Sequence, residues 1–153
     1  MLNLRTATHA LALALALSLV SGPAGAADNP QFMSPREAAS IRAKIKAQDY
    51  AGAITELNTL VQFGIVDADV FNLMGFAQRK SGNLGQAALF YDKALGMNPN
   101  HLGALEYQGE LFLMTGDRLR ADRNLARLRA LCPTGCEELE DLEEAIKAAE
   151  GKR

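Results

Sequence analysis

From residue 34 onward, apolar residues recur every three or four positions, which is the spacing that places them on one face of an α-helix. Ala38, Ile41 and Ile45 show this pattern after Ser34, in a Ser-Pro-Arg-Glu sequence typical of a helix start. The pattern continues between short polar or glycine-containing segments. It predicts further helices over about residues 50–61, 69–81, 84–95, 102–115, 118–131 and 137–149. The predicted fold class is therefore all-α.

A longer period accompanies the helical one, because several residue types recur 34 positions apart. The repeated pairs are Gly75 and Gly109, Gly82 and Gly116, Ala87 and Ala121, and Pro99 and Pro133. A fixed period of this length is typical of a repeat array, in which each unit buries its apolar face against its neighbours. The alternative is a helical bundle in which the spacing arises by chance.

The repeated residues are those that a helical hairpin requires. Gly75 and Gly109 are expected where the two helices of a hairpin approach closely, since a larger side chain would push the helices apart. Gly82 and Gly116 are expected to end a helix in the left-handed conformation. The residues after these two glycines are predicted N-caps of the next helix. They are Asn83 and Asp117.

One segment carries most of a known repeat pattern. Its residues are Phe71-Asn72-Leu73-Met74-Gly75, then Gly82, Ala87-Ala88-Leu89-Phe90-Tyr91, Ala94-Leu95 and Asn98-Pro99. This segment resembles a tetratricopeptide repeat (TPR). The resemblance implies a TPR-type helical-hairpin solenoid of about three repeats, with units near 34–67, 68–101 and 102–134. A capping helix and tail over 135–153 would close its end.

The resemblance also implies where a partner would bind. In this family the first helix of each pair lines a concave groove that holds a peptide or a partner helix. The groove-facing candidates are Arg42, Lys46, Asn72, Phe76, Arg79, Lys80, Glu106, Glu110, Leu113 and Met114. Phe76 and Met114 are the most informative, because packing does not require an apolar side chain at either position. They occupy positions at which some members clamp a C-terminal carboxylate, so we do not expect that mode here.

The first 26 residues differ from the rest. A short polar start is followed by an alanine- and leucine-rich stretch over 10–20, and Ala24-Gly25-Ala26 offers small residues to a signal peptidase. We predict a signal peptide over 1–26, a flexible tail over 27–33 and export, most simply to a bacterial periplasm. An uncleaved membrane anchor is the alternative. Cleavage would leave 15 basic and 18 acidic residues, a balance with no bias toward nucleic acid.

Five arginines lie between residues 118 and 129. Basic clusters attract phosphate, so a nucleic-acid interface is one interpretation. The favoured interpretation is that these arginines pair with the acidic last helix or face water. No nucleic-acid partner is predicted.

Cys132 and Cys136 flank the sequence Pro-Thr-Gly and are the only two cysteines. In an oxidising compartment neighbouring cysteines usually pair, so a structural disulfide is favoured. A redox-active pair is the first alternative, because Cys136 lies near a helix start, where the thiol pKa falls. Haem attachment and zinc binding are less favoured, since the cysteine spacing and the single His101 in the exported part do not match either motif.

No phosphate-binding loop, nucleophile elbow or paired metal motif is present in the sequence. We therefore predict a protein that is not an enzyme and needs no cofactor. The favoured function is an exported TPR scaffold that binds a protein or peptide partner in its groove, as an adaptor or assembly factor. The alternative is a thiol-disulfide or metal-handling accessory protein that uses Cys132 and Cys136. A third hypothesis makes the chain one subunit of a larger complex.

Overall fold

The computed structural model describes residues 32–151, and this part of the chain contains seven helices and no strand. The helices are α1 (Pro35–Lys46), α2 (Tyr50–Gln62), α3 (Ala68–Lys80), α4 (Leu84–Met97), α5 (Leu102–Met114), α6 (Arg118–Leu131) and α7 (Glu137–Glu150). The all-α prediction is confirmed, and the helix bounds agree with the predicted ones to within about two residues. The predicted signal peptide over 1–26 lies outside the described residues.

The predicted tail over 27–33 is described only at Phe32 and Met33. Phe32 is exposed, whereas the amide of Met33 donates a hydrogen bond to Asp67 Oδ2 at 2.7 Å. The chain is therefore attached to the start of α3 just before α1 begins.

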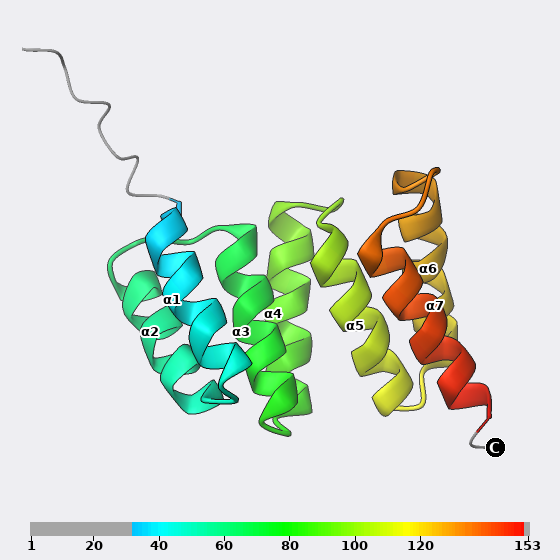
Figure 1. Cartoon of the computed structure of the whole chain (residues 1–153), viewed down its shortest axis with the longest axis horizontal. Coiled ribbons are helices and arrows are strands. Elements are labelled where there is room, and N and C mark those ends of the chain that lie inside the picture. The colour runs from blue at the N-terminus through cyan, green and yellow to red at the C-terminus, as the bar shows by residue number, and fades with distance from the viewer. Residues whose placement is uncertain (1–31, 152–153) are drawn as a thin grey trace, which may run out of the picture.

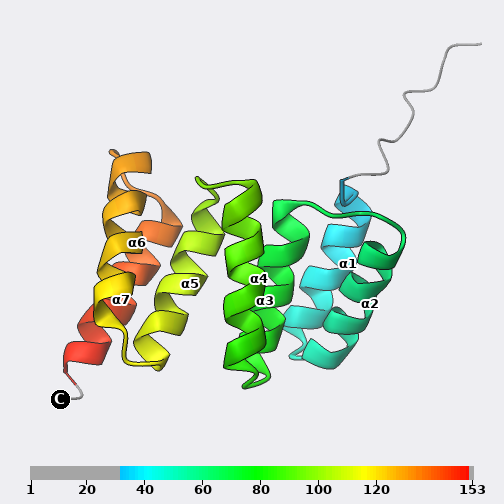
Figure 2. The same cartoon turned by 180° about the vertical axis from the view of Figure 1, so that it is seen from behind.

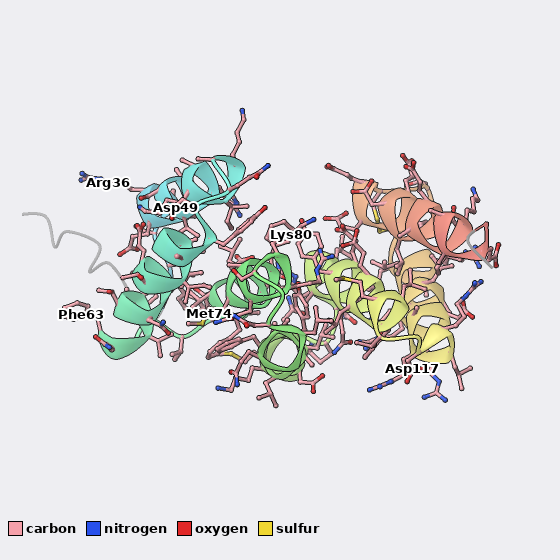
Figure 3. The ribbon with its side chains drawn as sticks, turned by 90° about the horizontal axis from the view of Figure 1, so that it is seen from below. Arg36, Asp49, Phe63, Met74, Lys80 and Asp117 are labelled. Carbon is pink, nitrogen blue, oxygen red and sulfur yellow. A yellow bond between two sulfur atoms is a disulfide. The ribbon has the colours of Figure 1, made fainter. Side chains whose placement is uncertain are left out.

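The helices lie side by side along the long axis of the molecule, with α1 and α2 at one end, α3, α4 and α5 in the middle, and α6 and α7 at the other end (Figures 1 and 2). Each helix contacts the next one, and α5 also contacts α3 and α7. Viewed along the helices, α1 and α7 lie on the same side of the row (Figure 3). Because α5 contacts both α3 and α7, these three odd-numbered helices share one face of the protein.

Side-chain caps fix most of the helix starts. Ser34 forms a full capping box with Glu37, and Asp49, Asp67 and Asp117 each accept a backbone hydrogen bond in the first turn of their helix. Asn83 is the N-cap residue of α4, as predicted, but its side chain does not cap the helix. Its side-chain amide donates to Gln78 Oε1 at 2.8 Å, and it makes no capping hydrogen bond to α4.

Glycines set the turns and one close helix contact. Gly82 and Gly116 have φ values of 82° and 80°, which confirms the predicted left-handed helix ends. A Cβ atom at Gly75 would lie 2.5 Å from the ring of Tyr91, so α3 and α4 touch there without space for a side chain. Tyr91 is fully buried. The glycine therefore makes room for the largest side chain of the core.

The core consists of three apolar clusters along the row. One joins α1, α2 and α3 through residues such as Ile41, Leu57 and Val70. A second surrounds Tyr91, between α4 and α5. The third contains Leu105 of α5 and Leu142 of α7, with α6 completing it. The last helix thus covers the apolar end of the row.

Candidate functional site

The shared face of α3, α5 and α7 has two hollows, one toward each end of these helices. The first hollow has a volume of about 480 Å³ and lies toward the C-terminal ends. Its walls come from Arg79 and Lys80 of α3, from Glu110, Leu113 and Met114 of α5, and from three alanines near the end of α7. Because apolar side chains form much of its surface and two cations border it, we call it the apolar hollow.

Arg79 connects three helices beside the apolar hollow. Its side chain is buried, forms an ion pair with Glu110 of α5, and donates from Nε to the hydroxyl of Tyr91 of α4 at 3.3 Å. Its guanidinium also lies 5.5 Å from the ring centre of Phe76 and 5.6 Å from that of Tyr107. The sequence placed Arg79 among the groove-facing residues, and the structure shows that it also supports the packing.

The Phe76 ring is half-buried and packs edge-on against Tyr107, with ring centres 4.8 Å apart. Lys80 is exposed, and its ammonium lies 5.3 Å from the Phe76 ring centre. In Figure 3 Lys80 lies on the side of α3 that faces the space between α1 and α7. Met114 is 56% exposed, although it is one of the larger apolar side chains. These residues give the middle of the face an aromatic and apolar surface with an exposed cation beside it.

The second hollow has a volume of about 260 Å³ and lies toward the N-terminal ends of α3, α5 and α7. We call it the acidic pocket, because most of the charged groups that line it are carboxylates. Those acids are Asp69, Glu106, Glu137, Glu138 and Asp141. Asn72, Tyr107, His101 and Arg42 complete most of its wall.

Two of the predicted groove residues are buried within this pocket wall. Glu106 is 4% exposed and Asn72 is 6% exposed. The Asn72 Oδ1 atom accepts no hydrogen bond from the described residues. Burial, reinforced by the charges of Glu110, Asp141 and Glu138, raises the pKa of Glu106 to about 8. Burial likewise raises the pKa of Tyr107 to about 12, and the charge of Glu106 contributes to this increase.

The remaining basic candidates lie on α1. Arg42 and Lys46 are both exposed. Arg42 lines the acidic pocket at the side of Asp69, whose carboxylate also contacts His101 Nε2 at 3.1 Å. That contact and the charge of Arg42 lower the pKa of Asp69. Lys46 lines neither hollow.

The acids of α7 were predicted as a charged outer side of a capping helix, and two of them pair as expected with α6. Arg129 contacts Glu143 at 2.7 Å, and Arg118 contacts Glu150 at 2.8 Å. The sequence did not indicate that other acids of α7 would border the same pocket as Glu106. A helical spacing places residues on a face of their own helix, but it does not say which helix that face meets.

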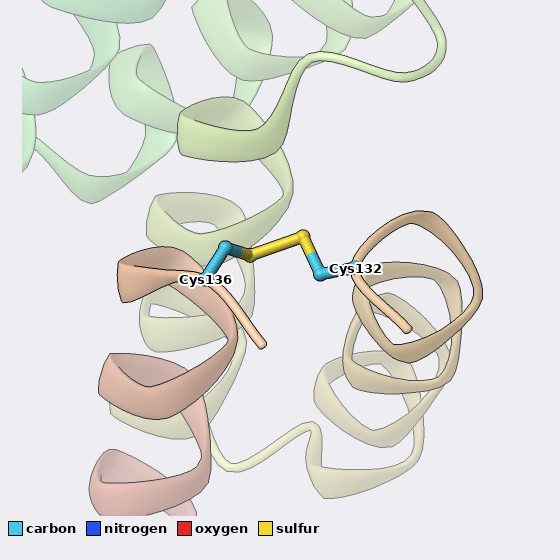
Figure 4. Close-up of a disulfide and its surroundings, with 2 residues drawn as sticks. All are labelled: Cys132 and Cys136. Carbon is cyan, nitrogen blue, oxygen red and sulfur yellow. A yellow bond between two sulfur atoms is a disulfide. The ribbon is translucent and has the colours of Figure 1, made fainter. Parts of the chain in front are cut away.

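Cys132 and Cys136 form a disulfide in the structure, as the favoured interpretation predicted, with Cα atoms 5.8 Å apart. Cys132 is the C-cap of α6 and Cys136 the N-cap of α7, so the bond joins the ends of these two helices (Figure 4). Cys132 is buried and Cys136 half-buried. Thr134 and Glu137 have the spacing of a capping box, which predicts Thr134 as the N-cap, but the structure shows that Cys136 is the N-cap of α7.

Comparison with models of known protein families and with curated proteins gives no match. Within residues 32–151, no helix has the length and apolar character needed to cross a bilayer. Nowhere in this range do three His, Cys, Asp or Glu side chains come together in a way that could hold a metal ion.

Proposed function

We propose that this chain is an exported, non-enzymatic scaffold of the TPR type, which binds a protein or peptide partner on the shared face of α3, α5 and α7. The site of export would be a bacterial periplasm. The chain would act as an adaptor or assembly factor. The 34-residue repeat and the row of consecutive helices support the architecture.

The observation that carries the binding proposal is the chemical contrast between the two hollows on one face. An apolar hollow bordered by Lys80 and an acidic pocket bordered by Glu106 lie along the same three helices. Between them, Phe76 and Tyr107 form an aromatic surface. Flexible Met114 and aromatic rings suit an extended or helical ligand, because they adapt to several side-chain shapes.

Truncation of the apolar side chains on this face tests the proposal. Phe76→Ala and Met114→Ala should each reduce the amount of partner that co-purifies with the chain from its native cell envelope by about tenfold, as expected for residues in a binding hot spot. The matched control is Leu89→Ala on α4, an exposed leucine that lines neither hollow. Equal recovery of the same partner with all three variants would contradict the proposal.

Thermal unfolding separates a binding role of Phe76 from a packing role. Phe76 is half-buried, so Phe76→Ala should leave the chain folded with a modest loss of stability. Loss of the cooperative transition would assign Phe76 to the core instead. Met114→Ala should leave the transition unchanged, because Met114 is exposed.

A thiol-disulfide accessory role is the second candidate, and the position of Cys136 favours it. Cys136 is half-buried at the N-terminus of α7, where a thiolate is stabilised. The reduction potential of the Cys132–Cys136 bond tests this role. A value near that of cellular thiol-disulfide oxidoreductases would support it, and a much lower value would identify a structural bond.

A further inference from the structure

Glu106 is the one buried carboxylate of the shared face that the fold itself does not explain. It is 4% exposed, and its carboxyl group forms neither an ion pair nor a side-chain hydrogen bond within the described residues. Glu110, one turn further along α5, is instead paired with Arg79. The ionised form of Glu106 is costly without a cation beside it, and a cation supplied by another molecule would stabilise that form.

The surroundings of Glu106 add to this cost. Charges on Glu110 of the same helix and on Glu138 and Asp141 of α7 disfavour its ionised form, and Arg79 of α3 is the cation that opposes them. Arg79 pairs through Nη1 with Glu110 and donates from Nε to Tyr91, while its Nη2 has no hydrogen-bond partner among the described residues, so it is not bonded to Glu106. The helix dipole does not stabilise the Glu106 carboxylate either, because Glu106 lies beyond the first turn of α5.

Other acceptors near Glu106 in the acidic pocket also lack donors. Asn72 is 6% exposed and lines the pocket, and its Oδ1 atom has no hydrogen-bond partner among the described residues. Glu138 and Asp141 form no ion pair with any described residue. Arg42 and His101 act on Asp69 at one side of the pocket. Around Glu106 the pocket presents several acceptors and the Tyr107 ring, which suit a group that donates several hydrogen bonds.

A guanidinium meets this requirement best. It carries five N–H donors in one plane, it remains charged at any physiological pH, and it stacks on aromatic rings. A metal ion fits less well, because no three His, Cys, Asp or Glu side chains within residues 32–151 are placed to hold one.

We propose that the acidic pocket binds the guanidinium of an arginine side chain of the partner polypeptide, between Glu106 and Asn72. The inference rests on the proposed function, since it names the chemistry that one part of the shared face selects. It also gives Glu106 the cation that the fold does not provide.

The position of the apolar hollow adds a spacing to this inference. Glu106 in the acidic pocket and Leu113 in the apolar hollow are seven residues apart on α5, which corresponds to about 10 Å along the helix. An extended polypeptide covers this distance in about three residues. The partner segment should therefore carry an arginine about three positions from an apolar residue.

Two matched peptides test the inference by NMR titration of the isotope-labelled chain. The first is acetyl-Ser-Arg-Ser-Ser-Leu-Ser-amide, and the second has citrulline, a neutral analogue of the same shape, in place of arginine. The arginine peptide should shift the backbone amides of residues 103–107 and 137–141. The citrulline peptide should bind at least about tenfold more weakly and should not shift those amides.

Glu106→Gln should weaken binding of the arginine peptide by about tenfold, because the amide cannot pair with a guanidinium. The control is Glu144→Gln, which removes the same charge from an exposed position of α7 outside both hollows. Its affinity should stay within about twofold of the unmodified chain. In the unmodified chain the affinity should also rise between pH 6 and pH 8, as Glu106 loses its proton, and this rise should be absent in Glu106→Gln.

Three outcomes would overturn the inference. Equal binding of the two peptides, or no effect of Glu106→Gln, rejects the guanidinium pocket and leaves the shared face as a binding surface. No shift with either peptide at millimolar concentration rejects the pocket too, whereas the proposed function is judged separately by the Phe76 and Met114 variants. Binding of N-acetylargininamide as tight as that of the arginine peptide would show that a small guanidinium compound, rather than a polypeptide, is the ligand.

Discussion

Leu142 of α7 lies directly against the backbone of α5 at Gly109. A Cβ atom at Gly109 would be 2.7 Å from both methyl carbons of Leu142, a distance at which the buried Leu142 side chain or one of the two helices must shift. The contact sets how closely α7 approaches α5. It therefore also sets the position of Glu138 and Asp141 beside Glu106 in the acidic pocket.

Gly109→Ala should therefore destabilise the protein. Overpacking of a filled site costs about 1–3 kcal/mol, which exceeds the gain of about 1 kcal/mol that alanine brings to a helix interior. Urea unfolding measures the difference. The control is Gly96→Ala in α4, where an added Cβ meets no atom within 4 Å and the stability should rise. If Gly109→Ala is as stable as Gly96→Ala, the close contact is not present in solution.

Loss of the Cys132–Cys136 disulfide should lower the free energy of unfolding by about 2 kcal/mol, the value of the chain-entropy model for a very short loop. The bond joins the end of α6 to the start of α7, so α7 should lose protection first. Hydrogen exchange on oxidised and reduced protein measures this local effect. Uniform loss of protection along the chain would argue against a local attachment of α7.

The mass of the chain isolated from its native compartment shows whether the disulfide is present there. Alkylation without reduction should leave Cys132 and Cys136 unlabelled, and prior reduction should make both available. Labelling of both cysteines without reduction would show free thiols and would contradict a structural disulfide.

Glu106 should make stability fall as the pH rises. Its pKa is about 8 in the folded protein and ordinary in the unfolded chain, so between about pH 4.5 and pH 8 the unfolded state has released a proton that the folded state still holds. The slope of the unfolding free energy is then negative, up to about 1.4 kcal/mol per pH unit. Thermal unfolding at pH 5 and pH 8 measures it.

Glu106→Gln should remove most of this slope, because a neutral amide replaces the group that titrates. The variant should be more stable than the unmodified chain at pH 8 and similar to it at pH 5. The matched variant Glu144→Gln should keep the slope. A slope that survives in Glu106→Gln would show that another group carries it.

Arg79 and Lys80 are adjacent cations with predicted opposite roles. Arg79→Met removes the ion pair with Glu110 and the hydrogen bond to Tyr91. It should lower the free energy of unfolding by about 2 kcal/mol. This loss is smaller than for a fully buried ion pair, because Glu110 is partly hydrated. Lys80→Met changes an exposed residue and should stay within about 0.5 kcal/mol. Chemical unfolding of both variants compares them. Similar costs would mean that the Arg79 cluster does not support the fold.

Most of the fold follows from local features of the sequence. Asp49, Asp67 and Asp117 cap helices, and Gly82 and Gly116 end them, because each acts through its own backbone within one turn. Such effects depend on residue type and position alone, so the helix bounds were predictable.

Contacts between distant helices were harder to predict. The sequence placed Gly109 at a contact within its hairpin, by analogy with Gly75, but the structure places Leu142 of α7 there. The 34-residue repeat alone does not indicate how the last helix packs against the preceding helices. The sequence also did not predict that Glu106 and Arg79 are buried, because charged residues are seldom buried. Their burial results from packing against other helices, which local sequence does not indicate.

Site-specific photo-crosslinking in the native cell envelope tests most directly whether the face of α3, α5 and α7 binds a polypeptide partner. A photoreactive amino acid at position 80 or 114 should give the same crosslinked partner, since Lys80 and Met114 are exposed beside one hollow. The same amino acid at position 89 or 93 of α4, outside both hollows, should give none. Crosslinks of equal yield from Leu89 and Lys93, or none from Lys80 and Met114, would contradict the account.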